Sequence, residues 1–439
     1  MSVQTVDAGG RSQSMTSAPV APHGPALQSA LRLVQVDHAR LAALLGGASG
    51  AGGESGAAAF ERAFPGAIGA ACIGAAGIGA ACVGAACTGA AAHGPLLADA
   101  VPDLPLAPVH MKRLVPQHSA GAPQATPGAG HDASCYEIWQ CAADDLRSVR
   151  RGALHYRYSE AAGLVFGSIV LNEADFAAQP ATHAQAPLER ATDAAYRMLF
   201  DLLDGLDMPH PLRIWNTVPA INLEQHGAER YRQFNAGRQR AFEACRRTLT
   251  GSVPAACALG SVGPLSAQGV PGEPLAVYFL ASRTSADAIE NPRQVSAFHY
   301  PAQYGARAPT FARAAAWSGA AGACTAPVLF ISGTASIVGH RTVHHGDVLA
   351  QTRETLANLA AVLDQAARQG HGPFALADLT FKVYVRDGAD AAMLAAIDSQ
   401  LREAAGPHVR ALYLHADVCR SDLLIEIEAS AGHAVASLA

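Results

Sequence analysis

The feature that most constrains the fold is a short run near the C-terminal end in which apolar and acidic residues alternate. Positions 423–428 read LLIEIE. Successive side chains of a β-strand point to opposite faces, so the two isoleucines share one face with Leu423. Glu426 and Glu428 then share the other face with Leu424. Alternation alone predicts an antiparallel strand whose acidic face meets water.

The composition indicates a folded chain of two or three domains. Its 439 residues exceed one ordinary domain, and 50% of them are hydrophobic. The net charge of −5 comes without a block of like charges, which argues against nucleic acid and anionic membranes as partners. The nine cysteines form no CxxC pair and show no zinc-ligand spacing with histidine. Because the N-terminus also lacks a secretory signal pattern, we expect reduced thiols in a cytoplasmic protein.

Residues 1–98 differ from the rest in their low complexity, and we expect them to be disordered. Positions 27–45 have the spacing of a short amphipathic helix, and 46–56 resemble a Gly/Ala/Ser linker. Positions 68–92 repeat a pentapeptide, IGAAC-IGAAG-IGAAC-VGAAC-TGAAA. This tract is long and uncharged enough for a membrane span, but its regular glycines disfavour a helix and no anchoring flank follows. We interpret it as a low-complexity insertion, with a membrane segment and a packed Gly/Ala element as alternatives.

From about position 135 the sequence alternates between predicted strands and helices. We expect a first domain at 99–255 and a second, catalytic domain at 256–439. The strands are predicted at 135–141, 163–171, 212–215, 275–281, 328–331 and 379–385, and the helices at 188–206, 229–248, 351–366 and 390–405. Two successive groups of strands and helices of similar size predict an α+β fold with a paired architecture.

Several separated motifs carry a resemblance to a known family. QTRETLANLAAVL at 351–363, followed by a strand, a helix and the closing LLIEIEA, resembles the YjgF-like (Rid) fold. Four further motifs are similar to those of chorismatases: LRIWNTVPAIN at 212–222, ERYRQFNAGRQRAFEA at 229–244, SAFHYPAQYGARAPTFARA at 296–314 and FISGTASIVGH at 330–340. The resemblance implies two YjgF/chorismate-mutase-like layers, each a β-sheet plus helices, in one chain. Residues 1–95 have no counterpart in that family.

The resemblance implies an enzyme that cleaves the enolpyruvyl ether of chorismate without a cofactor. Chorismatases release pyruvate together with either a dihydroxycyclohexadienoate or a hydroxybenzoate. The ether breaks most easily when an acid protonates the exocyclic methylene, which requires a carboxyl group that stays neutral near pH 7. In the family this acid is the first glutamate of the closing strand, which corresponds to Glu426. An enclosed pocket beside the strand would raise the pKa of that carboxyl group.

Two further positions imply the hydroxybenzoate-forming type of the family. Cys419 lies seven residues before Glu426, where a cysteine goes with aromatisation and a small inert residue goes with simple hydrolysis. A thiol near the ring could steer the intermediate or relay a proton, whereas a buried cysteine that only packs is the alternative. Gly333, in the SGTA motif, is expected to face the same pocket and to leave extra room beside the substrate.

The two carboxylates of chorismate require arginine, because the guanidinium fork matches a carboxylate in a bidentate way. Arg313 in PTFARA is the first candidate, and Arg307 and Arg420 are further candidates. Tyr300 and Tyr304 in HYPAQYG suit hydrogen bonds to a carboxylate or ring hydroxyl while they cover an apolar ring face. A solvated arginine and ordinary loop packing of the tyrosines are the alternatives.

The segment GHRTVHHGD at 339–347 contains three histidines and an aspartate at spacings that could gather metal ligands. The segment is rich in turn residues, and the sequence offers no second group to complete a ligand shell. We therefore expect no metal and no cofactor.

The expected function is cleavage of chorismate to pyruvate and 3-hydroxybenzoate, with 4-hydroxybenzoate as an additional product. Three alternatives remain open: hydrolysis to the trans-dihydroxycyclohexadienoate, a Rid-type imine deaminase, and a non-catalytic module that senses aromatic acids. A deaminase would use an arginine near the last strand, and Arg410 lies one position away from the expected place. YjgF-like domains usually form trimers with sites between subunits. The chain is therefore expected to be a trimer or, if the paired layers satisfy those contacts, a monomer.

Overall fold

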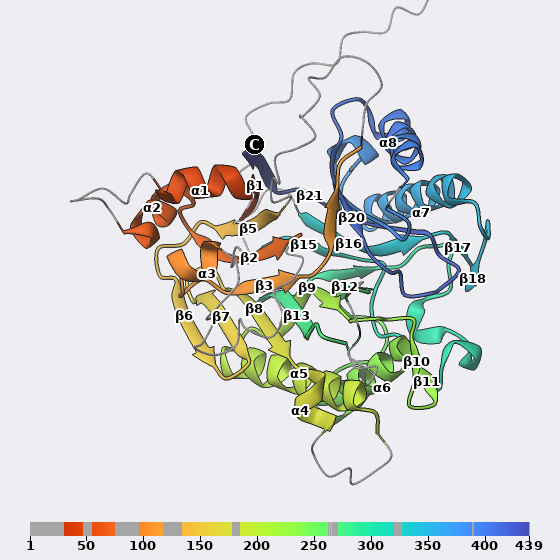
Figure 1. Ribbon diagram of the computed structural model, residues 1–439, viewed down its shortest axis with the longest axis horizontal. Helices are drawn as coiled ribbons and strands as arrows, with labels where there is room; N and C mark the ends of the chain where they lie inside the picture. The colour runs from red at the N-terminus through yellow and green to blue at the C-terminus, as the bar shows by residue number, and fades with distance from the viewer. Residues whose placement is uncertain are drawn as a thin grey trace, which may run out of the picture.

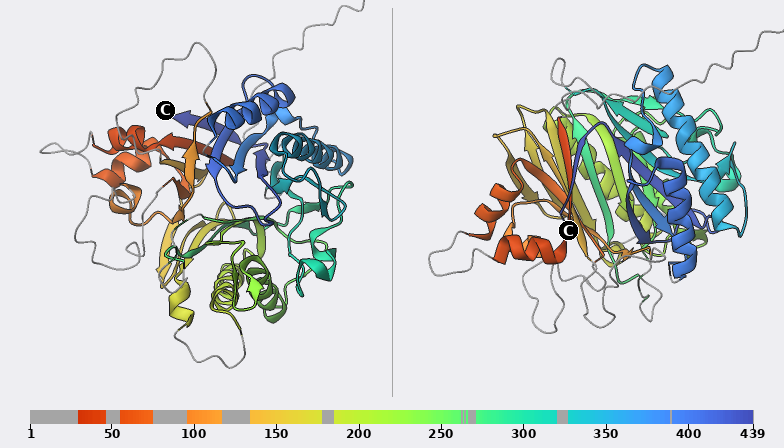
Figure 2. Two further views of the ribbon diagram at one scale, coloured as in Figure 1. Left: turned by 45° about the vertical axis from the view of Figure 1, so that its right-hand side comes forward. Right: turned by 90° about the horizontal axis from the view of Figure 1, so that it is seen from above.

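The computed structural model describes residues 30–46, 55–74, 96–116, 134–177, 185–261, 263, 265, 271–319, 327–388 and 390–438. Their strands form three large sheets whose inner faces surround a common hydrophobic core (Figures 1 and 2). In that core the ring of Trp139 lies 6.3 Å from Trp215 and 5.9 Å from Phe330, and each of these residues belongs to a different sheet. Helices cover the outer side of each sheet, so Figure 2 shows three groups of helices around the strands.

The six-stranded sheet comes from the middle of the chain. Its elements are β6 Arg147–Arg151, β7 Leu154–Ser159, β8 Leu164–Leu171, β9 His210–Thr217, β12 Ala255–Leu259 and β13 Leu275–Ser282, with α4 Glu173–Ala177, α5 Pro187–Gly205, the β10–β11 hairpin (Glu224–Gln225 and Ala228–Glu229) and α6 Arg230–Ala244. The strand order is β12-β9-β13-β8-β7-β6, and only β12 and β9 are parallel. The apolar sides of α5 and α6 pack on the outer face of this sheet.

The seven-stranded sheet carries most of the C-terminal half. Its elements are β4 Lys112–Leu114, β14 Asp287–Ile289, β15 Ala314–Trp317, β16 Val328–Ala335, β19 Thr380–Val385, β20 Arg410–His415 and β21 Ile425–Ala431, with β17 Ile337–Val338, β18 Arg341–Thr342, α7 Val348–Arg368 and α8 Ala391–Ala405. The order is β14-β15-β16-β21-β19-β20-β4, and only β19 and β20 are parallel. Asp347 caps α7 by accepting a hydrogen bond from the amide of Ala350. The apolar face of α7, which includes Leu356 and Leu359, is buried against the sheet.

The third sheet joins the two ends of the chain. Its elements are β1 Leu31–Asp37, β2 Ala67–Ile73, β3 Leu106–Val109, β5 Cys135–Cys141 and β22 Ala434–Leu438, with α1 His38–Gly46, α2 Gly56–Ala63 and α3 Leu96–Ala100 outside. The order is β22-β1-β5-β2-β3. Its contacts with both larger sheets make it a third layer around the common core.

The paired α+β architecture is confirmed, but the prediction for the N-terminal region is wrong where the structure describes it. Residues 31–37 form a buried strand instead of the first part of a helix, and a helix begins only at His38. The first pentapeptide lies in β2, all of whose residues are buried, so a packed Gly/Ala element is right for that repeat. A side chain at Gly69 would overlap the ring of Phe166, which explains why small residues are needed there. The rest of the repeat tract, from 75 to 92, lies outside the described residues.

The predicted domain boundary between residues 255 and 256 also needs correction. β12 crosses that boundary and β13 lies beyond it, but both pair with β9 in the six-stranded sheet, and β13 pairs in addition with β8. The chain leaves this sheet only after Ser282. No helix in the described ranges is both long and apolar enough to cross a membrane.

Candidate active site

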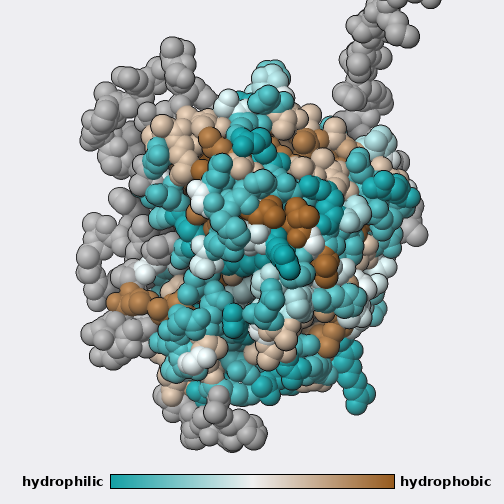
Figure 3. Space-filling view, turned by 90° about the vertical axis from the view of Figure 1, so that its right-hand side faces the viewer, coloured by the Kyte–Doolittle hydropathy of each residue, from teal (hydrophilic) through white to brown (hydrophobic). Residues whose placement is uncertain are grey.

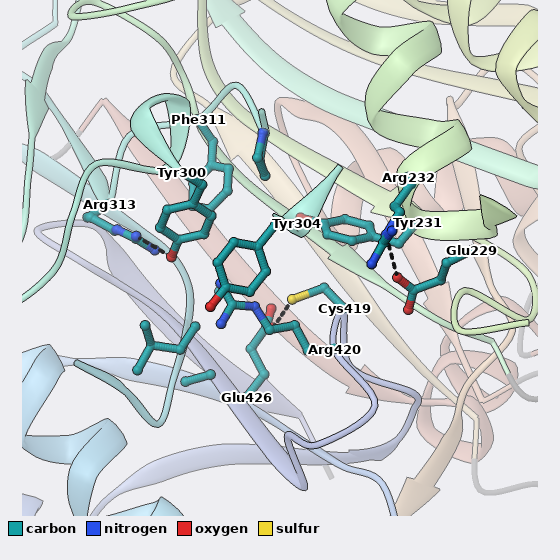
Figure 4. Close-up of a pocket in the computed structure, with 14 residues that line it drawn as sticks. Glu229, Tyr231, Arg232, Tyr300, Tyr304, Phe311, Arg313, Cys419, Arg420 and Glu426 are labelled. Carbon is teal, nitrogen blue, oxygen red and sulfur yellow. Dashed lines mark hydrogen bonds and ion pairs between the residues drawn. The ribbon is translucent and has the colours of Figure 1, made fainter. Parts of the chain in front are cut away.

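A pocket opens where the six-stranded and seven-stranded layers meet (Figure 4). Its walls come from the start of α6, the loop before β15, the end of β16, the connector 416–424 between β20 and β21, and β21 itself. It holds about 600 Å³ of space, its open mouth included. Seven of the eight predicted site residues line it, namely Tyr300, Tyr304, Arg313, Gly333, Cys419, Arg420 and Glu426.

Glu426 and Glu428 share one face of β21 as predicted, but that face does not meet water. Both residues are only 4% exposed, while Ile425 and Ile427 on the opposite face pack in the core beneath α7. Burial and the neighbouring negative charge of Glu428 raise the pKa of Glu426 to about 8, against the opposing charge of Arg213. The Glu426 carboxyl group is therefore mostly neutral at pH 7.

Glu428 belongs to a second group of side chains, which we call the central ion network. Arg213 of β9 donates Nη2 to the Glu428 carboxylate. Lys382 Nζ of β19 lies 3.0 Å from Glu428 Oε1 and 2.6 Å from Oε2 of Glu137 on β5. Burial opposes the ionisation of Glu428, but the charges of Lys382 and Arg213 outweigh it and lower its pKa. These four residues join all three sheets.

Cys419 touches the Glu426 carboxyl group from the connector. Its Sγ lies 3.8 Å from Glu426 Oε2, in the geometry of a thiol donating to an oxygen (Figure 4). Burial and the negative charge of Glu426 raise the pKa of the thiol. Cys419 is thus an S–H group near neutral pH and not a thiolate nucleophile.

Polar residues of α7 position this part of the pocket. Gln351, the first residue of the QTRETLANL motif, donates Nε2 to the Asp422 carbonyl at 3.0 Å. Its Oε1 accepts from the amide of Leu424 at 2.7 Å. Asn358 donates Nδ2 to the carbonyls of Ala335 and Ile337, both at 3.0 Å. The buried amides of this helix therefore fix the connector and the end of β16.

Gly333 faces the pocket as predicted, but the space beside it is already occupied. A Cβ at this position would lie 1.8 Å from Glu426 Oε1 and 3.2 Å from the Cβ of Cys257. The pairing of β16 with β21 is interrupted between Ile331 and Thr334, which brings the Gly333 backbone close to the carboxyl group. Glycine at position 333 thus makes room for the Glu426 carboxyl group. It does not create free space beside a substrate.

Two arginines in the pocket keep unused N–H groups. Arg313 is 4% exposed and donates Nη2 to the Tyr300 hydroxyl at 2.8 Å, while its buried Nε finds no hydrogen-bond partner in the described part of the chain. Arg420 stacks on Tyr304, with its Cζ 4.1 Å from the ring centroid. Its Nη1 donates to the His340 carbonyl at 3.0 Å, and its buried Nη2 likewise lacks a described partner.

Comparison with known proteins identifies the family. Residues 137–281 match the family model described as chorismatase FkbO/Hyg5-like, N-terminal. A 3-hydroxybenzoate synthase from Streptomyces hygroscopicus is 42% identical over 244 residues, which cover 54% of this chain and 68% of that protein. This chain belongs to the chorismatase family. A chorismatase from Streptomyces rapamycinicus is 39% identical over 243 residues, covering 54% of this chain and 68% of the relative.

A crystal structure of a chorismatase shares the architecture. It aligns with a TM-score of 0.62 at 28% identity, and the match covers 83% of this chain and 93% of that one. The family model ends at residue 281, which coincides with the end of β13 and not with the boundary that we expected at 255.

The structure does not bring Arg307 into the pocket of this chorismatase. Arg307 Nη1 lies 2.7 Å from Glu243 Oε1 on the surface, where both side chains are more than two-fifths exposed. Seven lining residues were not predicted: Glu229, Tyr231, Arg232, Pro309, Phe311, Ala335 and Ile337. Three of them belong to ERYRQFNAGRQRAFEA, whose arginines and aromatic residues were the available signal, although we used that motif only for a helix and for the family resemblance.

The histidine-rich loop does not gather metal ligands. The described residues contain no group of three or more histidine, cysteine, aspartate and glutamate side chains that could hold a metal ion. His344 instead lies 3.5 Å from Glu354, and His345 lies 3.6 Å from Asp422. These histidines thus contact acids at the start of α7 and in the connector.

Proposed function

We propose that this chorismatase cleaves the enolpyruvyl ether of chorismate and releases pyruvate together with 3-hydroxybenzoate. The observation that carries this proposal is the buried Glu426 carboxyl group, neutral near pH 7, with the Cys419 thiol 3.8 Å from it. A relative that is 42% identical is named for this product, which supports it over 4-hydroxybenzoate.

Binding uses the two arginines with unused donors. Chorismate carries two carboxylates, and the buried Nε of Arg313 and Nη2 of Arg420 are each available for one of them. Tyr300 and Tyr304 hold these guanidinium groups over their ring faces and line the pocket beside them. The arrangement fixes both ends of a dianion beside the acid.

Cleavage begins with Glu426. Its proton goes to the exocyclic methylene carbon, and the electron pair of that double bond forms the new C–H bond. Positive charge then develops at the former enol carbon and is shared with the ether oxygen. The Glu426 carboxylate that remains lies beside this charge and stabilises it.

The two products differ in their demand for water. Hydrolysis to the dihydroxycyclohexadienoate consumes one water molecule, whereas 3-hydroxybenzoate and pyruvate together contain the atoms of chorismate and no others. In 3-hydroxybenzoate the oxygen stands on the ring carbon that carried the ether, so the oxygen of the neighbouring ring hydroxyl bonds to that carbon while the ring–ether bond breaks and pyruvate leaves with the ether oxygen. The Glu426 carboxylate takes the hydroxyl proton. This proton returns to the oxygen, with the Cys419 thiol as relay, as the bond to its original carbon breaks, and the ring proton that then leaves to complete the aromatic ring goes to the Glu426 carboxylate. This returns Glu426 to its neutral form, so the cycle needs no outside proton.

Incubation of the purified protein with chorismate tests the proposal, with liquid chromatography and mass detection of the products. We expect pyruvate and 3-hydroxybenzoate in equal amounts. Pyruvate with only the dienediol acid would show simple hydrolysis, and binding of chorismate without turnover would show a sensor. Pyruvate release no faster than in a protein-free control would reject the enzyme assignment altogether.

We also propose that the protein is a monomer in the cytoplasm. Three sheets of one chain already surround the common core, which leaves no place there for sheets of a second or third copy. On the face shown in Figure 3, hydrophobic residues form small separate groups within a hydrophilic described surface, unlike a broad apolar interface. The six described cysteines are free, which fits a reducing compartment. Light scattering measures the oligomeric state directly.

A further inference from the structure

The connector 416–424 carries both Cys419 and Arg420, yet it has no helix or strand of its own. Its shape therefore depends on contacts with its surroundings. One residue that contacts the connector is Arg386, which follows directly after β19. Arg386 has no place in the chemistry described above.

The guanidinium group of Arg386 holds the peptide groups on both sides of Cys419. Its Nη2 donates to the carbonyl of Val418 at 3.0 Å and to the carbonyl of Arg420 at 2.9 Å. Its Nε donates to the carbonyl of Leu423 at 2.8 Å. Three backbone carbonyls of one irregular segment thus accept from a single side chain.

The remaining nitrogen ties the connector to the opposite wall of the pocket. Arg386 Nη1 donates to the carboxylate of Asp417 and, at 3.1 Å, to Oδ1 of Asn222. Asn222 in turn donates to Glu229, which lines the pocket from the other layer. The backbone takes part too, since the amide of Arg386 donates to the Leu424 carbonyl at 3.0 Å.

Only arginine has the donors for this set of contacts. The planar guanidinium presents five N–H groups in a fixed geometry, whereas lysine has a single nitrogen that cannot reach three carbonyls, a carboxylate and an amide together. The charge pair with Asp417 alone would not require arginine.

We propose that Arg386 is a positioning residue that holds the Cys419 thiol against Glu426 and the Arg420 guanidinium in the pocket, and thereby determines which product forms. The proposal rests on the proposed function for its effect on products. A displacement of about 1 Å in a catalytic group can cost a large factor in rate, so loosening the connector has a measurable effect.

Arg386→Lys tests this, and Arg402→Lys is the matched control. Arg402 lies on α8 in the same layer and bonds Asp398 and a carbonyl in a similar way, but away from the pocket. In Arg386→Lys we expect the ratio of 3-hydroxybenzoate to dienediol acid to fall by about tenfold, and KM to rise because Arg420 is displaced. In the Cys419→Ala background the same substitution should leave the product ratio unchanged, because the thiol through which it acts is gone.

A second measurement does not depend on turnover. Alkylation of Cys419 by iodoacetamide, followed by mass spectrometry, should be at least about fivefold faster in Arg386→Lys, while Cys245 reacts at the wild-type rate. If wild type releases no pyruvate, the proposed function is wrong and this labelling alone decides the positioning role. Asp417→Asn, which keeps nearly the same shape, should change both readouts in the same direction and replaces Arg386→Lys if that variant does not fold. Unchanged Cys419 labelling, or an unchanged product ratio in active enzyme, would overturn the proposal.

Discussion

The pocket and the central ion network each contain one glutamate of β21, and the pKa values of these two side chains are shifted in opposite directions. Glu426 and Glu428 lie two residues apart on the same face of β21, and both are 4% exposed. The pKa of Glu426 is raised to about 8 by burial and by the charge of Glu428, and the opposing charges of Arg213 and Arg313 do not offset this rise. The pKa of Glu428 is lowered, because Lys382 and Arg213 lie against its carboxylate.

The difference shows that burial alone does not decide the charge of a carboxyl group. Burial always favours the neutral form, and only nearby cations and donors can reverse it. Here the network keeps one acid ionised, and that ionised acid helps to keep its neighbour neutral. Two glutamates with separated pKa values on one strand form an arrangement typical of acid catalysis. Substitutions in the pocket and in the central ion network can test whether the charge of Glu428 raises the pKa of Glu426.

The largest effect is expected from Glu426→Gln, which removes the acid and keeps the size of the side chain. Pyruvate release should fall by a factor on the order of 10² to 10⁴, because general acid catalysis contributes that much. Glu403→Gln, an exposed position on α8, is the control. Steady-state rates with chorismate measure the effect, and turnover near the wild-type rate would exclude Glu426 as the proton donor.

The second effect concerns pH. Because an acid must be protonated to act, kcat/KM should stay constant below about pH 8 and fall above it. Glu428→Gln removes the negative charge beside Glu426, so ionised Glu426 becomes easier to form and its pKa falls. The alkaline limb should then move to lower pH by about one unit or more. The free energy of unfolding should also drop by about 3–5 kcal/mol, because Arg213 loses its buried partner.

Glu137→Gln separates these two consequences of disturbing the network. Glu137 pairs with Lys382 at 2.6 Å, but it is not among the main groups that shift the pKa of Glu426. This variant should lose a similar amount of stability, measured by urea unfolding, while its pH profile stays that of wild type. If Glu137→Gln moved the alkaline limb as far as Glu428→Gln, the coupling between the two acids would not be specific.

The sequence was sufficient to place both glutamates on one face, but not to distinguish them. Alternation is a local property, and it correctly predicted β21 and its two faces. The cations that separate the two acids are remote, since Arg213 lies 215 residues before Glu428. The family motifs supplied the role of Glu426, and the role itself stays a prediction.

Remote pairing also explains the errors at the N-terminal end. LRLVQVD at Leu31–Asp37 has apolar residues at both strand and helix spacing, and its strand conformation follows from pairing with β5 and β22. Those partners lie about a hundred positions away in one case and about four hundred in the other. For Arg307 and Glu229 in the site, too, the local sequence does not determine the position of the side chain. Their motifs were visible, but which side chain turns to the pocket depends on how the two layers meet.

The smallest effect on rate is expected from Cys419→Ala, and it refines the account of the pocket. The thiol does not supply the first proton, so kcat/KM should fall by less than about tenfold. The alkaline limb should move slightly upward, because the hydrogen bond from Cys419 lowers the pKa of Glu426. Product analysis should show less 3-hydroxybenzoate and more dienediol acid. Cys245→Ala, at another half-buried free cysteine, should alter neither the profile nor the products. If Cys419→Ala also left the product ratio unchanged, the thiol would only pack, and Glu426 alone would handle both proton transfers.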